Sequence, residues 1–192
     1  EVRNQLTFGN PDGLLVVYVG RLAPEKRLDK LLTMCRSVDN VYLALIGDGP
    51  VGAACAARHG QRKSPNPGRK RKGDVYCRPA FLAHDALPRI YASADVHVSC
   101  STFETLGNTV PEAHACSTPV LVPRAQGFVD TVTDKVDGFL FDAGNLAEGA
   151  RLLARLRDER DLCCSMGAKG REKVLQQSPE LVMEDIVAWY KR

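Results

Sequence analysis

The sequence predicts an α/β fold in which a parallel sheet is covered by helices on both faces. Short apolar runs rich in β-branched residues alternate along the chain with segments whose apolar residues recur at helical spacing. Each run is evenly apolar, as expected of strands that are buried on both faces. Because crossovers between parallel strands are right-handed, the loops that follow the strands should share one edge of the sheet. Ligands bind at that edge in Rossmann-like domains, which is the architecture we expect here.

Six runs fit the description of a buried strand. They span residues 14–19, 41–46, 75–77, 95–99, 119–122 and 138–141. Helices are expected in the intervening segments and after the last strand, over residues 24–35, 51–59, 85–94, 109–116 and 145–192. Proline suits the first turn of a helix, and Pro24, Pro88 and Pro111 lie near three of these starts. After Pro24, apolar side chains recur at helical spacing from Leu28 to Cys35.

The composition is that of a globular domain. The chain has 192 residues, of which 44% are hydrophobic and 26% charged, and residues 1–192 suit one domain. No stretch approaches the roughly 20 apolar residues that are needed to cross a bilayer. The chain begins at Glu1, without a signal-peptide pattern or an initiator methionine, so we expect it to be part of a longer protein. The seven cysteines include no Cys-x-x-Cys pair, which favours a reducing compartment such as the cytoplasm.

The net positive charge of the chain comes from one segment. Seven basic residues and no acid occur between Arg58 and Gly73, whereas the net charge of the whole chain is only +3. Residues 60–73 lack periodicity and contain prolines and glycines, so a flexible loop is expected there. Because the charge is not spread over a face, nucleic acid is not an expected partner. The loop is either a solvated insertion, which we favour, or a contact for anionic lipid head groups.

The end of the first predicted strand carries two cations. Gly20-Arg21 follows the strand, and Lys26 lies five residues after the arginine. Glycine lets the backbone approach a ligand, arginine offers a planar fork to phosphate oxygens, and lysine offers a mobile charge. The pattern fits an anion site from a loop and a helix start, although two solvated surface cations are the better interpretation if it is taken alone.

A second polar segment follows the fourth predicted strand. It runs from Phe103 to Glu112, with carboxylates at Glu104 and Glu112 on either side of a turn that contains Gly107. The amides of such a turn suit an anion or a hydroxyl, and carboxylates accept hydrogen bonds from vicinal hydroxyls of sugars. Singly, Glu104 could offset a helix dipole and Glu112 could be an exposed helix residue. The two together are harder to explain without a ligand.

Other polar residues give weaker signals. The turn Gly47-Asp48-Gly49-Pro50 resembles part of a phosphate loop but lacks a third glycine, so a turn without a ligand is the better interpretation. His97 lies within an apolar strand and is expected to be a structural histidine with a satisfied hydrogen bond. His114 is expected to be a helix-surface or packing residue.

Four motifs resemble, in order, those of glycosyltransferase family 4. They are Gly20-Arg21-Leu22-x2-Glu25-Lys26, Ile46-Gly47-Asp48-Gly49-Pro50, Glu104-x7-Glu112 and Ser117-Thr118-Pro119-Val120. The resemblance covers residues 14–143, and four ordered motifs are more specific than any one of them. Within the family, Arg3-x2-Leu6-x2-Gly9-x-Pro11 ahead of the first strand is similar to the sulfoquinovosyltransferases of sulfolipid synthesis.

The resemblance implies that the chain is the donor-binding half of a GT-B fold, without the N-terminal acceptor domain. The implied activity is the transfer of a hexose, with retention of configuration, from a nucleotide-diphosphate sugar that is UDP-linked. No metal or other cofactor would be required, and no Asp-x-Asp motif occurs in the sequence. For the sulfolipid subgroup, sulfoquinovose would pass to diacylglycerol at a membrane surface, in the plastid. The isolated half would be inactive.

The resemblance also assigns roles to residues. Arg21 and Lys26 would neutralise the donor diphosphate, and with Glu104, which would contact the transferred sugar, they would be catalytic. Glu112 would hold the nucleotide ribose, and Phe81 would lie near the base. The other donor-binding positions would be Gly20, Thr105, Leu106, Gly107, Asn108 and Thr109.

Three positions depart from the family pattern. Ala80, Ser117 and Gln126 stand where glycine is common, which leaves the sugar and the base unassigned. Two alternatives to a transferase remain: a nucleotide-binding module without catalysis, and another sugar-phosphate enzyme of similar architecture.

Overall fold

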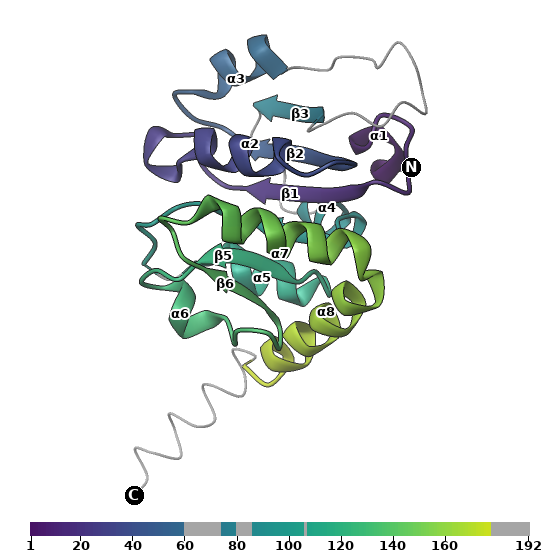
Figure 1. Cartoon of the computed structure of the whole chain (residues 1–192), viewed down its shortest axis with the longest axis vertical. Helices are drawn as coiled ribbons and strands as arrows, with labels where there is room; N and C mark the ends of the chain where they lie inside the picture. Colours follow the sequence, from purple (N-terminus) through teal and green to yellow (C-terminus); the bar gives the residue numbers. More distant parts are fainter. Residues whose placement is uncertain (60–73, 80–85, 106, 178–192) are drawn as a thin grey trace, which may run out of the picture.

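The computed structural model describes residues 1–59, 74–79, 86–105 and 107–177. In this part of the chain six strands form one parallel sheet in the order β3-β2-β1-β4-β5-β6 (Figure 1). The strands are β1 (Leu14–Val19), β2 (Val41–Gly47), β3 (Asp74–Pro79), β4 (Val96–Val98), β5 (Val120–Pro123) and β6 (Gly138–Phe141). The predicted α/β fold is therefore confirmed, and each strand lies where an apolar run predicts it.

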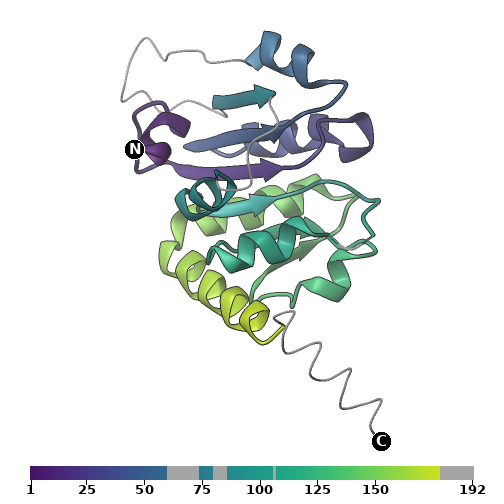
Figure 2. The same cartoon turned by 180° about the vertical axis from the view of Figure 1, so that it is seen from behind.

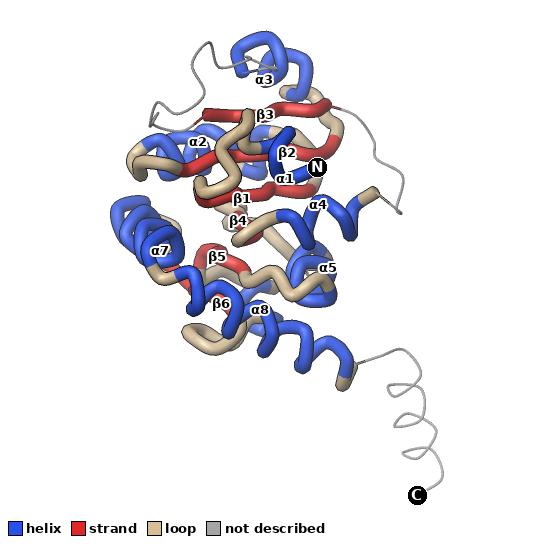
Figure 3. The backbone as a smooth tube through the Cα atoms, turned by 90° about the vertical axis from the view of Figure 1, so that its right-hand side faces the viewer, coloured by secondary structure: helices blue, strands red, loops and turns tan. Residues whose placement is uncertain are grey.

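Helices cover both faces of this sheet. They are α1 (Val2–Leu6), α2 (Leu28–Arg36), α3 (Gly52–His59), α4 (Leu87–Ser93), α5 (Thr109–Ala115), α6 (Phe128–Thr131), α7 (Leu146–Asp158) and α8 (Arg160–Leu175). Helices α2 and α7 lie on one face, and α1, α4 and α5 lie on the other (Figures 2 and 3). Helix α3 packs against β3, and α8 packs against α5 near the opposite edge of the sheet.

The strands bury their side chains alternately in two cores. In β1, Leu14 and Val16 belong to the core under α2 and α7, whereas Leu15 and Val17 belong to the core under α4 and α5. All four side chains are fully buried. Burial of each contributes roughly 1.5–3 kcal/mol, which anchors the central strand between the two helical layers.

Asp95, just before β4, ties the N-terminal segment to the sheet. Its carboxylate pairs with Arg3 at 2.8 Å and with Arg160 at 2.8 Å, and it accepts a hydrogen bond from the Leu15 amide. Arg3 also donates to the carbonyl oxygens of Pro11, Gly13 and Ser93. The arginine of the N-terminal motif, Arg3, therefore has a structural role where β1 and β4 begin, at the edge of the sheet opposite the carboxyl ends of the strands.

Several local features differ from the prediction. The helix expected from Pro24 is a 3₁₀ turn, η1 (Pro24–Lys26), followed by Arg27 in the left-handed region at φ +51° and only then by α2. Lys26 therefore ends a tight turn and does not lie at the start of an α-helix. The short helices α1 and α6 were not predicted, because four or five residues are too few to show a periodicity.

Two of the departures from the family pattern have a backbone explanation. Ser117 lies at φ +59°, a conformation that favours glycine. In the pair Gln126-Gly127, the second position is at φ +86°, and a Cβ atom there would lie 2.4 Å from the Glu104 carbonyl oxygen. The glycine that this turn requires has therefore been kept. Ala80, the third departure, lies outside the described residues.

Candidate functional site

A cavity of about 570 Å³ opens where the order of the strands reverses. The chain runs outward from β1 to β2 and β3, and then returns to β4 on the other side of β1. The loops after β1 and β4 therefore diverge, which leaves a crevice between them at the carboxyl ends of the strands. The lining consists of Tyr18, Val19, Gly20, Arg21, Glu25, Lys26, Ser99, Phe103, Glu104, Thr105, Gly107, Asn108 and Thr109.

The loop after β1 is held in place by its backbone. The Tyr18 hydroxyl donates a hydrogen bond to the Arg21 carbonyl at 2.9 Å, and the Leu22 amide donates to the Asp48 carbonyl at 2.8 Å. A Cβ atom on Gly47 would lie 1.9 Å from the Gly20 carbonyl oxygen, so this close packing requires glycine. The Gly-Asp-Gly-Pro turn thus supports the arginine loop, and none of its residues is among those that line the cavity.

Lys26 and Glu104 meet across the cavity. The lysine Nζ lies 2.9 Å from Glu104 Oε2, although the two residues are 78 positions apart in the sequence. About a fifth of each side chain is exposed. The carboxylate of Glu104 therefore pairs with a cation, so it does more than offset a helix dipole, which is the alternative interpretation for this residue.

The backbone around Glu104 is fixed from the side of β5. Gly127 packs closely against this segment, since a Cβ atom on it would lie 2.4 Å from the Glu104 carbonyl oxygen and 2.8 Å from that of Thr105. On the other side, the Ser101 hydroxyl donates to the Phe103 carbonyl at 3.0 Å. These contacts hold the carboxylate where it faces the cation loop.

The charges that line the cavity balance. Arg21 and Lys26 are opposed by Glu25 and Glu104. Burial raises the pKa of Tyr18, and the carboxylates of Glu104 and Glu25 raise it further, so its hydroxyl stays protonated and donates to the arginine loop. An anion that enters this crevice can meet Arg21 directly, whereas it competes with Glu104 for Lys26.

Glu112, on α5, does not line the cavity. It lies three residues after Thr109, which does, so both occupy one side of the same helix. Its Oε2 accepts a hydrogen bond from the Tyr91 hydroxyl at 3.0 Å. The residue is exposed, as one interpretation of the sequence expected, but its carboxylate is held by a buried partner.

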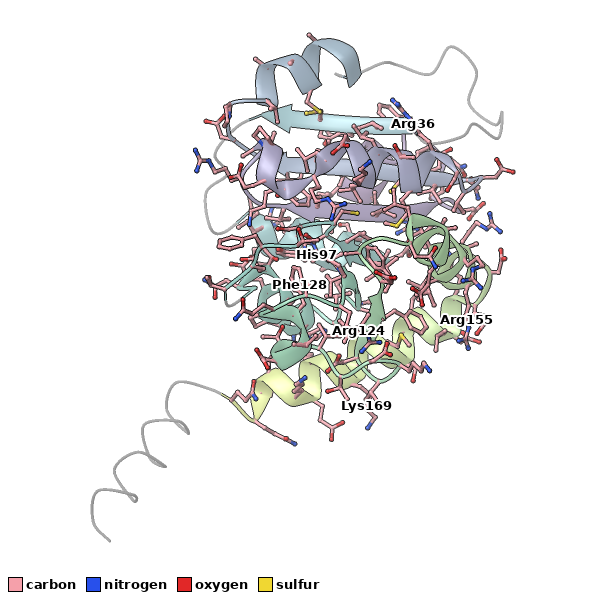
Figure 4. The ribbon with its side chains drawn as sticks, turned by 60° about the vertical axis from the view of Figure 1, so that its left-hand side comes forward. Arg36, His97, Arg124, Phe128, Arg155 and Lys169 are labelled. Carbon is pink, nitrogen blue, oxygen red and sulfur yellow. The ribbon has the colours of Figure 1, made fainter. Side chains whose placement is uncertain are left out.

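His97 supports the first turn of α5 from below. Its side chain is fully buried, in the interior of the molecule (Figure 4), and its Nε2 lies 3.2 Å from the Thr109 hydroxyl. Burial lowers the pKa of His97 to about 4, so the ring is neutral at physiological pH. The expected structural histidine is confirmed, with Thr109 as the partner of Nε2, whereas its buried Nδ1 has no hydrogen-bond partner among the described residues. His114 is also buried, and its Nε2 lies 3.1 Å from the Asp137 carbonyl oxygen, so it is a packing residue.

The cavity brings together most of the residues that the sequence selects. Gly20, Arg21, Lys26, Glu104 and Thr105 line it, together with Gly107, Asn108 and Thr109. Phe81, Leu106 and the basic loop over residues 60–73 lie outside the described residues. The lining also includes residues that the sequence analysis did not assign to a site: Tyr18, Val19, Glu25, Ser99 and Phe103. The sequence could have indicated them, because each lies at or shortly after the carboxyl end of β1 or β4.

A second, apolar groove of about 400 Å³ separates η1 and α2 from α3. Among the described residues its lining consists of one charged residue, Asp29, together with Ala23, Pro24, Leu28, Leu32, Val51, Ala54 and Cys55. These described side chains offer no cation to a phosphate, in contrast to the cavity at the strand ends.

The described residues hold neither a candidate metal site nor a candidate membrane span. No group of three or more His, Cys, Asp or Glu side chains in that part of the chain is placed to bind a metal ion. No helix within it combines the length and the apolar character that a membrane span requires. All seven cysteines are free thiols, five of them buried. The cellular compartment remains a prediction.

The chain is an α/β domain with a cavity, lined in part by charged residues, at the switch point of a parallel sheet. Residues 13–159 match the family Glycosyl transferases group 1. Because this match covers well over half of the chain, the protein belongs to that family.

Relatives and solved structures agree with this assignment. The chain is 31% identical to sulfoquinovosyl transferase SQD2 of Arabidopsis thaliana, over 90% of the chain and 32% of that protein. It is 32% identical to a GDP-mannose-dependent alpha-mannosyltransferase of Mycobacterium tuberculosis (strain CDC 1551 / Oshkosh), over 95% of the chain and 44% of that protein. The chain thus spans less than half the length of these relatives. In structure it resembles Anabaena HepE in complex with UDP and glucose, with a TM-score of 0.73, 22% identity, and 99% of this chain and 51% of that one covered. This likeness supports the GT-B half-fold.

Proposed function

We propose that this domain binds a nucleotide-diphosphate sugar in the cavity between the loops after β1 and β4, as the donor of a retaining glycosyl transfer. The observation that carries the proposal is that Arg21, Lys26 and Glu104 line one cavity from segments far apart in the sequence. Two cations suit a diphosphate, and they stabilise the charge that grows on it as the glycosidic bond breaks. A carboxylate beside them suits the hydroxyls of the transferred sugar.

The donor would lie along the cavity from the sugar to the nucleotide. In this arrangement Arg21 and Lys26 hold the diphosphate, and Glu104 turns from Lys26 to the sugar. Glu112 holds the ribose beyond the α5 side of the cavity, and Phe81 lies near the base. The reaction needs no metal, because the two cations take the role that a divalent ion has in other transferases.

The other half of the enzyme would supply the acceptor. The chain spans less than half of its relatives, so we propose a whole protein with a second domain that closes over the donor. A UDP-linked donor is proposed by analogy with Anabaena HepE, whose structure is in complex with UDP and glucose. The similarity to sulfoquinovosyl transferase SQD2 supports, as the most specific form, transfer of sulfoquinovose, for which diacylglycerol would be the acceptor. A lipid acceptor would bring the whole protein to a membrane surface, and the compartment would be the cytoplasm or the plastid.

A thermal-shift panel of UDP- and GDP-linked sugars tests the donor site. At least one of them should raise the melting temperature of this chain. The variant Lys26→Ala should weaken the response by roughly 1–3 kcal/mol of binding free energy, or about 5- to 150-fold in affinity, because a charged hydrogen bond is lost. Lys30→Ala is the matched control, since Lys30 lies four positions further along, 45% of its side chain is exposed, and its Nζ lies 3.9 Å from Asp29 Oδ2.

The outcomes separate the alternatives. If no nucleotide sugar stabilises the chain, the proposed donor site is wrong. If sugars bind but the full-length protein transfers none of them, the domain is a binding module without catalysis. If the full-length protein transfers sugar with inversion at the anomeric carbon, the retaining mechanism is wrong. A comparison of UDP-sulfoquinovose with UDP-glucose decides the sugar.

A further inference from the structure

Glu112 is exposed, yet its carboxylate is hydrogen-bonded to a tyrosine that belongs to the core. Its carboxylate accepts a hydrogen bond from the Tyr91 hydroxyl at 3.0 Å, although Tyr91 lies on the neighbouring helix α4 and is 1% exposed. A glutamate on the surface of a helix normally samples several rotamers, and fixing one of them costs conformational entropy. The contact to a buried tyrosine removes that freedom.

Tyr91 itself is held from two directions. The edge of its ring meets the ring of His97, with centroids 5.7 Å apart and planes at 70°. The Thr118 hydroxyl donates a hydrogen bond to its carbonyl oxygen at 2.7 Å. Burial raises the pKa of Tyr91, and the nearby Glu112 carboxylate raises it further, so the hydroxyl remains a donor.

The contacts return to the cavity through His97. Its Nε2 lies 3.2 Å from the hydroxyl of Thr109, which lines the cavity one turn of α5 before Glu112. The side of α5 that faces the donor is therefore fixed at two points, by His97 at Thr109 and by Tyr91 at Glu112. Tyr91 takes one carboxylate oxygen of Glu112, Oε2, and among the described residues no hydrogen bond to the other oxygen is found, so that oxygen can accept one from a ligand.

We propose that Tyr91 is a positioning residue that aims the Glu112 carboxylate at the ribose hydroxyls of the donor nucleotide, with His97 holding the tyrosine ring and α5 in register. This inference rests on the proposed function, in which Glu112 holds the ribose. In addition, the selectivity for ribose over 2′-deoxyribose depends on the buried Tyr91 hydroxyl, which does not itself touch the donor.

Calorimetric titration of this chain with UDP and with 2′-deoxy-UDP tests the inference. The wild type should prefer UDP by about tenfold or more, because a hydrogen bond from the 2′-hydroxyl to a carboxylate is lost with the deoxy ligand. In Tyr91→Phe, which keeps the ring and removes the hydroxyl, the preference should fall to about threefold. In Glu112→Gln it should fall below about twofold, and the double variant should match Glu112→Gln because both changes act on one contact.

Tyr42→Phe is the matched control. Tyr42 is a buried tyrosine in the same core as Tyr91, and its hydroxyl accepts a hydrogen bond from the Asn10 side chain at 2.8 Å, at the far end of β2 from the cavity. Its substitution should lower the stability to urea to a similar extent as Tyr91→Phe and leave the preference for UDP at the wild-type value.

Each result has one meaning. A preference in Tyr91→Phe that equals the wild type, or an equal loss of affinity for both ligands, would overturn the positioning role. So would a wild type that binds UDP without preferring it to 2′-deoxy-UDP, and in that case the donor site itself would stand. A wild type that binds neither ligand would refute the proposed function, and the inference with it.

Discussion

The ion pair between Lys26 and Glu104 predicts that a substitution will tighten the binding of one ligand and weaken that of another. In Glu104→Gln the lysine loses its carboxylate partner at 2.9 Å while the side chain keeps its shape. A pair with about a fifth of each side chain exposed contributes about 1 kcal/mol. UDP lacks the transferred sugar that would contact Glu104. It should therefore bind this variant about fivefold tighter, because its phosphates no longer compete with the Glu104 carboxylate for Lys26.

The donor with its sugar should respond in the opposite direction. Replacing the carboxylate weakens the hydrogen bonds to the sugar hydroxyls by roughly 1.5–3 kcal/mol, which exceeds the gain at Lys26. A UDP-sugar should therefore bind about 2- to 30-fold more weakly. The ratio of the two dissociation constants, measured by isothermal titration calorimetry, is the informative quantity.

The control for this experiment is Glu25→Gln. Glu25 also lines the cavity, but the ion pair found for Lys26 is with Glu104, so the affinity for UDP should rise by much less. The gain in Glu104→Gln should also shrink somewhat at high salt, because salt screens the attraction within this partly buried ion pair, although less than within an exposed one. If Glu104→Gln binds UDP no better than the wild type does, the carboxylate does not compete with the diphosphate for Lys26, and this reasoning is refuted.

Three further predictions concern stability and the loops that hold the site. Burial lowers the pKa of His97 to about 4, so as the pH falls below about 6.5 the unfolded state binds a proton there and the folded state does not. Between pH 7 and pH 4.5 the free energy of unfolding should therefore fall by about 2–3 kcal/mol more in the wild type than in His97→Leu, as measured by urea unfolding at both pH values. An equal loss in both proteins would contradict this. Gly127→Ala should reduce stability by about 2 kcal/mol, because a Cβ atom at φ +86° collides with the Glu104 carbonyl oxygen, and it should lower donor affinity because Glu104 is displaced. Unchanged affinity by calorimetry would show that donor binding does not depend on the present position of the Glu104 loop. Ser117→Gly should raise the free energy of unfolding by about 0.5–1 kcal/mol without altering affinity, since it relieves a left-handed serine at φ +59°, and a lower melting temperature would argue against that strain.

The sheet could be predicted from the sequence because its strands are buried on both faces. Each strand is then a short run of apolar residues that is read directly, as in Leu14–Val19. The cavity followed from the same reasoning, since Arg21 and Glu104 come shortly after two strands that pair with one another in a parallel sheet. A parallel sheet places such residues at one edge without any knowledge of their contacts.

Contacts between residues distant along the chain could not be predicted in this way. Nothing near Lys26 indicates that its partner is Glu104, and nothing near Glu112 indicates a tyrosine on another helix. The start of α2 was also missed, because the left-handed backbone at Arg27 is not marked by a glycine or an asparagine. These features depend on tertiary packing, which overrides local preference.

A crystal structure of this chain with a bound UDP-sugar tests the central claim most directly. The account predicts diphosphate oxygens within hydrogen-bonding distance of Arg21 and Lys26, with the Glu104 carboxylate turned to the sugar. A donor seated in the apolar groove between α2 and α3, or one whose phosphates contact neither cation, would contradict it.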